Sequence, residues 1–310
     1  MKKIFIDGSA GTTGLRIRER LSAREDITLL SLPEEKRKDA DARREMLNAA
    51  DAVFLCLPDD AAREAVAMIE NPDVVVLDTS TAHRTQEGWT YGFPELSDAA
   101  EASVKRAKRI AVPGCHASGF IALIYPLIKA GILPSDAALS CTSLTGYSGG
   151  GKKMIADYES EDRNVLLGAP RQYGLSQAHK HLREMQAITG LASAPLFLPI
   201  VADFYSGMEV TVPLFAHQLC EGKTIEDIKA AYAAQYNTPL LSYVEGVDEA
   251  GFLSAAALSG KDSMQVSVYG NGERILLVAR YDNLGKGASG AAIECLNLVL
   301  GCNPYLGLEL

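Results

Sequence analysis

The sequence predicts an α/β protein with two domains: a doubly wound parallel-sheet domain, and an α+β domain with a mixed or antiparallel sheet. A chain of 310 residues is long for a single domain. Up to about residue 114, short continuous apolar runs alternate with helical stretches, whereas several later runs alternate apolar and polar residues. Continuous apolar strands joined by helices are typical of a parallel sheet covered on both faces, and alternation is typical of strands with one exposed face.

The elements of the first domain follow from these apolar runs. We expect strands at residues 3–6, 28–32, 52–57, 74–77 and 110–112. Helical spacing predicts helices at residues 15–23, 41–49, 61–70 and 97–108. Each strand is therefore followed by a helix, as a parallel sheet requires.

The second domain has a different pattern. We expect a helix at about residues 117–129 and strands at residues 138–144, 197–201, 209–215, 265–268 and 275–280. Tyr269-Gly270-Asn271-Gly272 supplies residues that tolerate positive φ, which indicates a hairpin turn. A last helix at about residues 287–300 is expected to return to the first domain. The predicted domains are thus residues 1–115 completed by residues 285–310, and residues 116–284.

Composition limits the classes of partner. The chain has 30 basic and 39 acidic residues, a net charge of −9, and no basic run longer than Lys36-Arg37-Lys38. Nucleic acids and membranes are therefore not expected as partners. Apolar stretches such as residues 120–128 are shorter than the roughly 20 residues that span a bilayer.

The six cysteines show neither a CxxC pair nor a zinc-ligand spacing, and the chain runs directly into a strand. We therefore expect reduced thiols and a cytoplasmic protein without a signal peptide.

A glycine-rich segment lies between the first expected strand and helix: Gly8-Ser9-Ala10-Gly11-Thr12-Thr13-Gly14. Glycines at this place let backbone N–H groups and a helix N-terminus approach a pyrophosphate. This placement favours a dinucleotide-binding loop of a Rossmann domain, and the alternative is a tight turn that binds no ligand.

The end of the second strand indicates which dinucleotide is bound. A fold that prefers NAD presents Asp or Glu there to the ribose 2′-hydroxyl, but this chain has Ser31, followed by Lys36-Arg37-Lys38. A hydroxyl and nearby cations suit a 2′-phosphate, so NADP is favoured. Glu34 and Glu35 weaken the inference, and a solvated loop is the alternative interpretation.

Cys115 is the candidate nucleophile. It lies in Pro113-Gly114-Cys115-His116-Ala117-Ser118, where a strand ends and an apolar helix begins. The helix dipole and unpaired N–H groups stabilise a thiolate at such a position. The other cysteines lie in apolar runs, in helices or near the tail, where a small buried side chain is the simpler interpretation.

Two of the five histidines, His179 and His181, are the candidates for the acid/base partner. His116 neighbours Cys115 in sequence, but adjacent residues on a helix do not face each other. His217 is expected on a strand, in a packed or edge position. The i, i+2 spacing of His179 and His181, with no third ligand nearby, argues against a metal site.

These motifs together resemble the short type of N-acetyl-γ-glutamyl-phosphate reductase, within the aspartate-semialdehyde dehydrogenase superfamily. The resemblance spans nearly the whole chain. Besides the segments above it includes residues 77–84, 91–95, 143–151 and 283–290.

The resemblance implies reduction by NADPH of N-acetylglutamyl 5-phosphate to the 5-semialdehyde, a step of arginine biosynthesis. An acyl phosphate transfers its acyl group to a thiolate, and the thioester then accepts hydride. Cys115 would form the thioester, and His179 or His181 would act as acid and base, with His179 favoured.

Other residues receive roles by resemblance. Arg84, Ser118, Ser148 and Gly149 are candidates for binding the substrate, and Asn283 for binding the nicotinamide. For Arg84 the alternative is a surface salt bridge, for the glycines a hairpin or helix cap, and for Asn283 the geometry of its own turn. His116 stands where the longer enzymes have an aromatic residue, which leaves its role open and makes it a competitor of His179 and His181 for the acid/base role.

A homodimer or homotetramer is expected, because strands with one exposed face favour pairing between subunits. Two other functions are compatible with these motifs. Aspartate-semialdehyde dehydrogenase would share the nucleophile and cofactor, and a dinucleotide-binding redox sensor would use Cys115 without catalysis.

Overall fold

The computed structural model describes all 310 residues and divides into two compact units. Unit 1 comprises residues 1–94, 98–114 and 288–308, and unit 2 comprises residues 95–97, 115–287 and 309–310. No helix is both long enough and apolar enough to cross a lipid bilayer.

Unit 1 contains a six-stranded, entirely parallel sheet with the strand order β2-β1-β3-β4-β6-β5. The strands are β1 (Lys2–Asp7), β2 (Ile27–Leu30), β3 (Ala52–Leu55), β4 (Val75–Asp78), β5 (Thr90–Tyr91) and β6 (Arg109–Ala111). The helices are α1 (Thr12–Ser22), α2 (Ala40–Ala49), α3 (Asp59–Ala67), α4 (Asp98–Arg106) and α9 (Gly290–Leu300).

Helices cover both faces of this sheet. Alternate side chains of β1 enter different cores: Ile4 and Ile6 pack with α1, α4 and α9, and Phe5 packs with α2 and α3. The predicted doubly wound domain is therefore confirmed, and α9 supplies part of one face.

Unit 2 contains a mixed seven-stranded sheet with the order β11-β12-β13-β10-β7-β9-β8. Its strands are β7 (Ser140–Gly146), β8 (Arg171–Gln172), β9 (Leu196–Ala202), β10 (Met208–Phe215), β11 (Leu241–Tyr243), β12 (Met264–Gly270) and β13 (Arg274–Tyr281). Two pairs, β7–β9 and β11–β12, are parallel and the others antiparallel. The mixed sheet matches the expected fold class.

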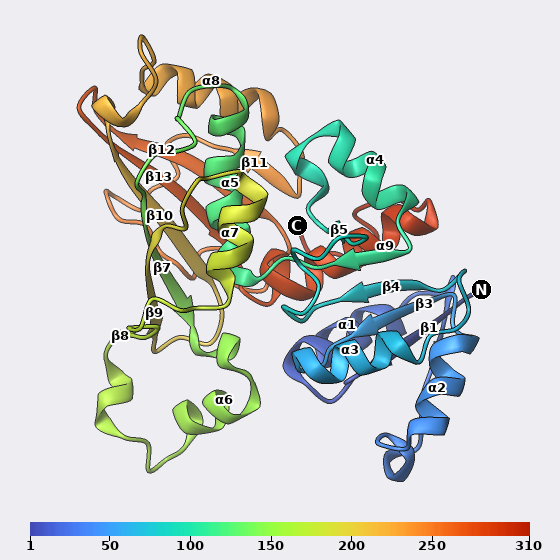
Figure 1. Cartoon of the computed structure of the whole chain (residues 1–310). Coiled ribbons are helices and arrows are strands. Elements are labelled where there is room, and N and C mark those ends of the chain that lie inside the picture. Colours follow the sequence, from blue (N-terminus) through green and yellow to red (C-terminus); the bar gives the residue numbers. More distant parts are fainter. The chain divides into compact units, whose positions relative to one another are not determined.

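The helices of unit 2 are α5 (Cys115–Lys129), α6 (Gly151–Glu159), α7 (His181–Thr189) and α8 (Ile225–Gln235). Figure 1 shows α5 and α7 side by side against the strands of this sheet. Eleven of the fifteen residues of α5 are buried, which explains its nearly continuous apolar sequence.

Several elements differ from the sequence prediction. The helices α6, α7 and α8 and the short strands β5, β8 and β11 were not expected. A signal for α8 was present, because Thr224 and Asp227 form a capping box at its start. The prediction that His217 lies on a strand is wrong: β10 ends at Phe215, and His217 lies in the 3₁₀ turn Ala216–Gln218.

The hairpin between β12 and β13 forms at the predicted turn. Gly270 has φ +113°, and a Cβ atom there would lie 2.1 Å from the carbonyl oxygen of Arg274. Asn271 closes the turn by donating its N–H to the same oxygen at 2.8 Å. Only glycine fits this position without strain.

Leu296 of α9 has an exposed fraction of 0% and lies in the core of unit 1. We expect Leu296→Ala to lower the free energy of unfolding by about 2–5 kcal/mol, because it leaves a cavity. Leu166→Ala is the control, since Leu166 is 67% exposed. Chemical unfolding curves measure both variants, and equal losses would contradict the packing of α9.

Candidate active site

The loop from Gly8 to Gly11 is closely packed against the end of β3. Gly8 has φ +87°, and a Cβ atom there would lie 2.2 Å from the carbonyl oxygen of Cys56. A Cβ atom on Gly14 would lie 2.6 Å from the carbonyl oxygen of Gly8. Side chains at these positions would therefore push the loop away from the end of β3, and α1 away from the loop.

The N-terminus of α1 has hydrogen-bond donors to offer an anion. Gly11, its N-cap residue, provides no side-chain cap, and the hydroxyl oxygen of Thr12 is buried without a hydrogen-bond partner. An uncapped helix N-terminus with an unpaired hydroxyl suits a phosphate group. These residues thus fit the pyrophosphate of a dinucleotide.

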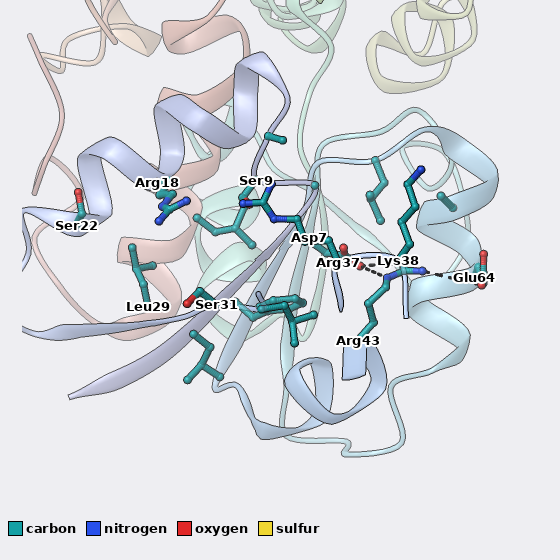
Figure 2. A pocket seen from close by; sticks show the side chains of 18 residues that line it. Asp7, Ser9, Arg18, Ser22, Leu29, Ser31, Arg37, Lys38, Arg43 and Glu64 are labelled. Carbon is teal, nitrogen blue, oxygen red and sulfur yellow. Dashed lines mark hydrogen bonds and ion pairs between the residues drawn. The ribbon is translucent and has the colours of Figure 1, made fainter. Parts of the chain in front are cut away.

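A pocket of about 690 Å³ opens beside this loop. Gly8, Ser9 and Ser31 line it, whereas Gly11, Thr12, Thr13 and Gly14 do not. Its other polar lining residues are Asp7, Arg18, Ser22, Arg37, Lys38, Arg43 and Glu64. Figure 2 shows Arg18 and Ser31 on one side of the pocket and Lys38 and Arg43 on the other.

The cations of this pocket differ in their partners. Arg43 pairs with buried Asp7 at 2.9 Å and approaches Glu64 at 4.0 Å, and these contacts are drawn in Figure 2. Burial raises the pKa of Asp7, although Arg43 acts to lower it. Arg37 lies 3.7 Å from exposed Glu34, and Arg18 and Lys38 form no ion pair. Arg18 and Lys38 are therefore the cations best able to bind an added anion.

Sequence reasoning did not single out Arg18. The residue lies on α1 four positions after Gly14, one helical turn beyond the glycine-rich segment. That spacing was visible in the sequence and could have placed Arg18 on the same side as the loop.

Arg84 lies after β4, where its guanidinium group donates hydrogen bonds to the backbone of unit 1. Its Nε donates to the carbonyl oxygen of Val112 at 2.9 Å, and Nη2 donates to that of Thr79 at 3.0 Å. Nearby, Nδ1 of His83 lies 2.6 Å from the carboxylate of Asp78. These contacts favour a role for Arg84 in holding the segment before Pro113, and its contact with substrate stays a prediction.

In unit 2, Cys115 is the first residue of α5, and Tyr281 fixes its position. The Tyr281 hydroxyl accepts a hydrogen bond from the N–H of Gly119 at 3.0 Å and donates one to the carbonyl oxygen of Cys115 at 2.5 Å. These two backbone groups would pair with each other in a regular helix. A Cβ atom on Gly119 would lie 2.7 Å from this hydroxyl, so glycine is needed there.

Three histidines lie together in unit 2. The ring centroids of His179 and His181 are 4.7 Å apart, and that of His116 lies 5.8 Å from His179 and 5.5 Å from His181. Tyr173 belongs to the same cluster, and burial raises its pKa, with a further contribution from the charge of Cys115. The structure thus brings both predicted histidines together with His116 and with Tyr173, whose pKa is affected by the charge of Cys115.

The two predicted histidines have different surroundings. Nδ1 of His179 accepts a hydrogen bond from the N–H of His181 at 3.3 Å, so neutral His179 carries its proton on Nε2. Burial lowers the pKa of His179, and Lys180 lowers it further. His181 is buried, and its Nε2 lies 3.9 Å from the buried carboxylate of Glu184.

Asn283 lies beside Ser148 and Gly149. Its Oδ1 accepts the N–H of Gly207 at 2.9 Å, and its Nδ2 donates to the Ser148 hydroxyl at 3.0 Å. A Cβ atom on Gly149 would lie 3.3 Å from this Nδ2. Three predicted binding residues therefore meet at one place, while Ser118 is buried within α5.

Sequence reasoning also missed a buried ion pair between Lys286 and Glu95, whose side chains are 2% and 9% exposed. It borders the nucleophile, because a Cβ atom on Gly287, the next residue, would lie 3.0 Å from Cβ of Cys115. Both residues lie in segments that the family resemblance covers, but nothing in the sequence pairs them.

Comparisons with known proteins define the class of this chain. Residues 3–104 match the model of the semialdehyde dehydrogenase NAD binding domain, and residues 115–283 match that of the semialdehyde dehydrogenase dimerisation domain. Aspartate semialdehyde dehydrogenase II of Vibrio cholerae, in complex with ASA, has a similar fold, with a TM-score of 0.74, 17% identity, and coverage of 97% of this chain and 98% of that one. The chain therefore belongs to the semialdehyde dehydrogenase family.

Curated relatives identify the particular family. N-acetyl-gamma-glutamyl-phosphate reductase 2 of Nostoc sp. is 46% identical over 318 residues, covering 99% of each chain. The reductase of Rhizobium etli is 47% identical over 305 residues, covering 96% of this chain and 98% of the relative. The chain belongs to the N-acetyl-γ-glutamyl-phosphate reductase family.

Burial lowers the pKa of His116 to about 3, with His179 contributing, whereas a histidine in the unfolded chain has the ordinary pKa of 6.5. Between these values only the unfolded chain binds the proton, so stability falls as pH decreases from about 6.5 towards 3. We expect His116→Phe to flatten this fall by about 1.4 kcal/mol per pH unit. Unfolding curves at a series of pH values test this, with exposed His217→Phe as the control. Parallel curves for wild type and His116→Phe would contradict it.

Proposed function

We propose that this protein reduces N-acetylglutamyl 5-phosphate to N-acetylglutamate 5-semialdehyde with NADPH and releases phosphate, a step of arginine biosynthesis. The observation that carries the proposal is the near-full-length identity of 46–47% with reductases of that name. The similarity to aspartate semialdehyde dehydrogenases is weaker evidence for their substrate, because 17% identity supports the fold alone.

In this proposal Cys115 is the nucleophile. Its thiolate attacks the acyl carbon, a C–S bond forms, and the bond to the phosphate oxygen breaks, which leaves a thioester and inorganic phosphate. The N-terminus of α5 stabilises the thiolate through the helix dipole. The hydrogen bonds of Tyr281 keep that first turn in place.

NADPH, when bound, supplies the hydride that reduces the thioester carbonyl. The Gly8–Gly14 loop, with Ser9, Thr12 and Thr13, suits its pyrophosphate, and Ser31 with Arg18 and Lys38 suits a 2′-phosphate. Asn283 is proposed to hold the nicotinamide carboxamide with the remaining N–H of its amide.

His179 is proposed as the acid, and His181 remains its alternative. The proton on Nε2 of His179 is available for the oxygen that gains charge when the carbonyl is reduced. Glu184 lies beside His181 and suits the orientation of that ring. Ser148 and Gly149, with Arg84 and Ser118, are proposed to contact the substrate.

Residues 1–115 with residues 285–310 are proposed to bind the dinucleotide, and residues 116–284 to carry catalysis and subunit contacts. The description of the second family model as a dimerisation domain supports a homodimer or homotetramer. A cytoplasmic location suits a biosynthetic enzyme with six cysteines in no disulfide.

Assays in the oxidative direction, with NADP⁺ and phosphate, test the substrate. We expect turnover of N-acetylglutamate semialdehyde and little turnover of aspartate semialdehyde, and the reverse preference would overturn the proposal.

Cys115→Ala should lower kcat by about 10⁴-fold or more, because covalent catalysis is lost. Cys302→Ala is the matched control, and activity retained by Cys115→Ala would remove Cys115 from the mechanism.

Ser31→Asp should move the cofactor preference towards NADH by about tenfold or more, because a carboxylate repels the 2′-phosphate and accepts a ribose hydroxyl. The ratio of kcat/KM for NADPH and NADH measures this change. Ser103→Asp, on the exposed side of α4, adds the same charge outside the pocket. An unchanged ratio in Ser31→Asp would show that the 2′-phosphate is recognised elsewhere.

A further inference from the structure

Both ring nitrogens of His116 lie at hydrogen-bond distance from a hydroxyl group. Nδ1 lies 2.6 Å from the hydroxyl oxygen of Ser143, and Nε2 lies 2.6 Å from that of Tyr173. His116 is 3% exposed and Ser143 is 0% exposed. A buried histidine with two short hydrogen bonds is held in one orientation.

These contacts join three side chains, Ser143, His116 and Tyr173, into one hydrogen-bonded chain. A neutral imidazole donates through one nitrogen and accepts through the other. Burial keeps His116 neutral, since its pKa falls to about 3. When Ser143 donates to Nδ1, Nε2–H of His116 donates to the Tyr173 oxygen, and the Tyr173 O–H is then available to a third group.

We take Cys115 as the acceptor for a hydrogen bond from this hydroxyl. Burial, with a contribution from the charge of Cys115, raises the pKa of Tyr173, so the hydroxyl keeps its proton. Cys115 directly precedes His116 at the start of α5, and the Tyr173 hydroxyl lies 2.6 Å from the ring of His116. We propose that His116 is a positioning residue that, with Ser143, holds the Tyr173 hydroxyl as a hydrogen-bond donor towards the Cys115 thiolate. No proton is transferred in this arrangement, which stabilises the thiolate by hydrogen bonding alone.

The other titratable groups around this chain do not replace it. His179 and His181 contact the His116 ring by their ring faces and edges, and Glu184 faces His181. The Tyr281 hydroxyl is bound to the backbone of α5, and Lys180 acts on His179. Both nitrogens of His116 are already used by Ser143 and Tyr173, so its effect on Cys115 passes through Tyr173.

The inference rests on the proposed function only in taking Cys115 as the nucleophile. Its test is the pH dependence of Cys115 alkylation by iodoacetamide in the intact protein, with mass spectrometry identifying the modified peptide. This readout needs neither substrate nor cofactor. Loss of thiolate stabilisation therefore appears even where reductase activity is absent, and the two proposals can fail separately.

Three variants decide the outcome. His116→Phe keeps a planar ring but removes both nitrogens, Tyr173→Phe removes the hydroxyl, and the third variant combines them. Each single variant should raise the apparent pKa of alkylation by about one unit, which is about a tenfold slower reaction at neutral pH. The double variant should shift no further than Tyr173→Phe alone, because His116 acts through that hydroxyl.

An unshifted His116→Phe, or a double variant whose two shifts add, would overturn the proposal. If His116→Phe does not fold, Ser143→Ala replaces it. Ser143→Ala should raise the apparent pKa of Cys115 alkylation by a smaller amount. In a protein that already carries Tyr173→Phe, it should cause no further rise. A shift from Ser143→Ala that persists in that background overturns it equally. His217→Phe is the matched control and should leave the alkylation profile of Cys115 unchanged.

Steady-state kinetics give a second readout. His116→Phe should lower kcat while the KM for NADPH stays near the wild-type value, because the change affects the sulfur and not the dinucleotide pocket. A rise in that KM with an unchanged kcat would show that residue 116 acts through the general fold instead.

Discussion

The hydroxyl of Tyr281 is the contact on which the reactive end of α5 depends. It bridges the N–H of Gly119 and the carbonyl of Cys115, two groups that a regular helix would join directly. The first turn is thereby tied to the end of β13, and the helix cannot move along its axis without leaving buried polar groups unpaired. Such a loss costs about 1–3 kcal/mol per group, a large part of the stability of a domain.

The residues that follow Tyr281 continue this arrangement. Asp282 is fully buried and accepts hydrogen bonds from the N–H groups of Leu284 and Gly285 and from the hydroxyl of Ser206. Asn283 links Gly207 and Ser148. Three consecutive side chains at the end of one strand thus organise the nucleophile, the turn before the last helix, and the loop that follows β7.

Local signals were sufficient where one segment determines its own surroundings. The glycine-rich turn, the apolar strands of unit 1 and the helix that begins at Cys115 all follow from spacing and residue type. Contacts between distant segments left no such signal: Tyr173 meets His116 across 57 positions, and Lys286 meets Glu95 across 191. The helix α7 was missed because its start, His179-Lys180-His181, has no side-chain cap to mark it. In the structure the segment leads into α7, which packs against α5.

The contribution of α9 to unit 1 also affects how the chain folds during synthesis. Ribosomes deliver residues 1–114 first, yet one face of that parallel sheet is completed only by residues 288–308. Unit 2 has nearly all of its residues available earlier, so the part of the apolar sheet face that α9 covers stays exposed while most of the polypeptide is being translated. Nascent chains that stall before α9 emerges would expose this apolar surface to chaperones. The yield of folded protein in a cell should therefore depend on how quickly the final helix follows.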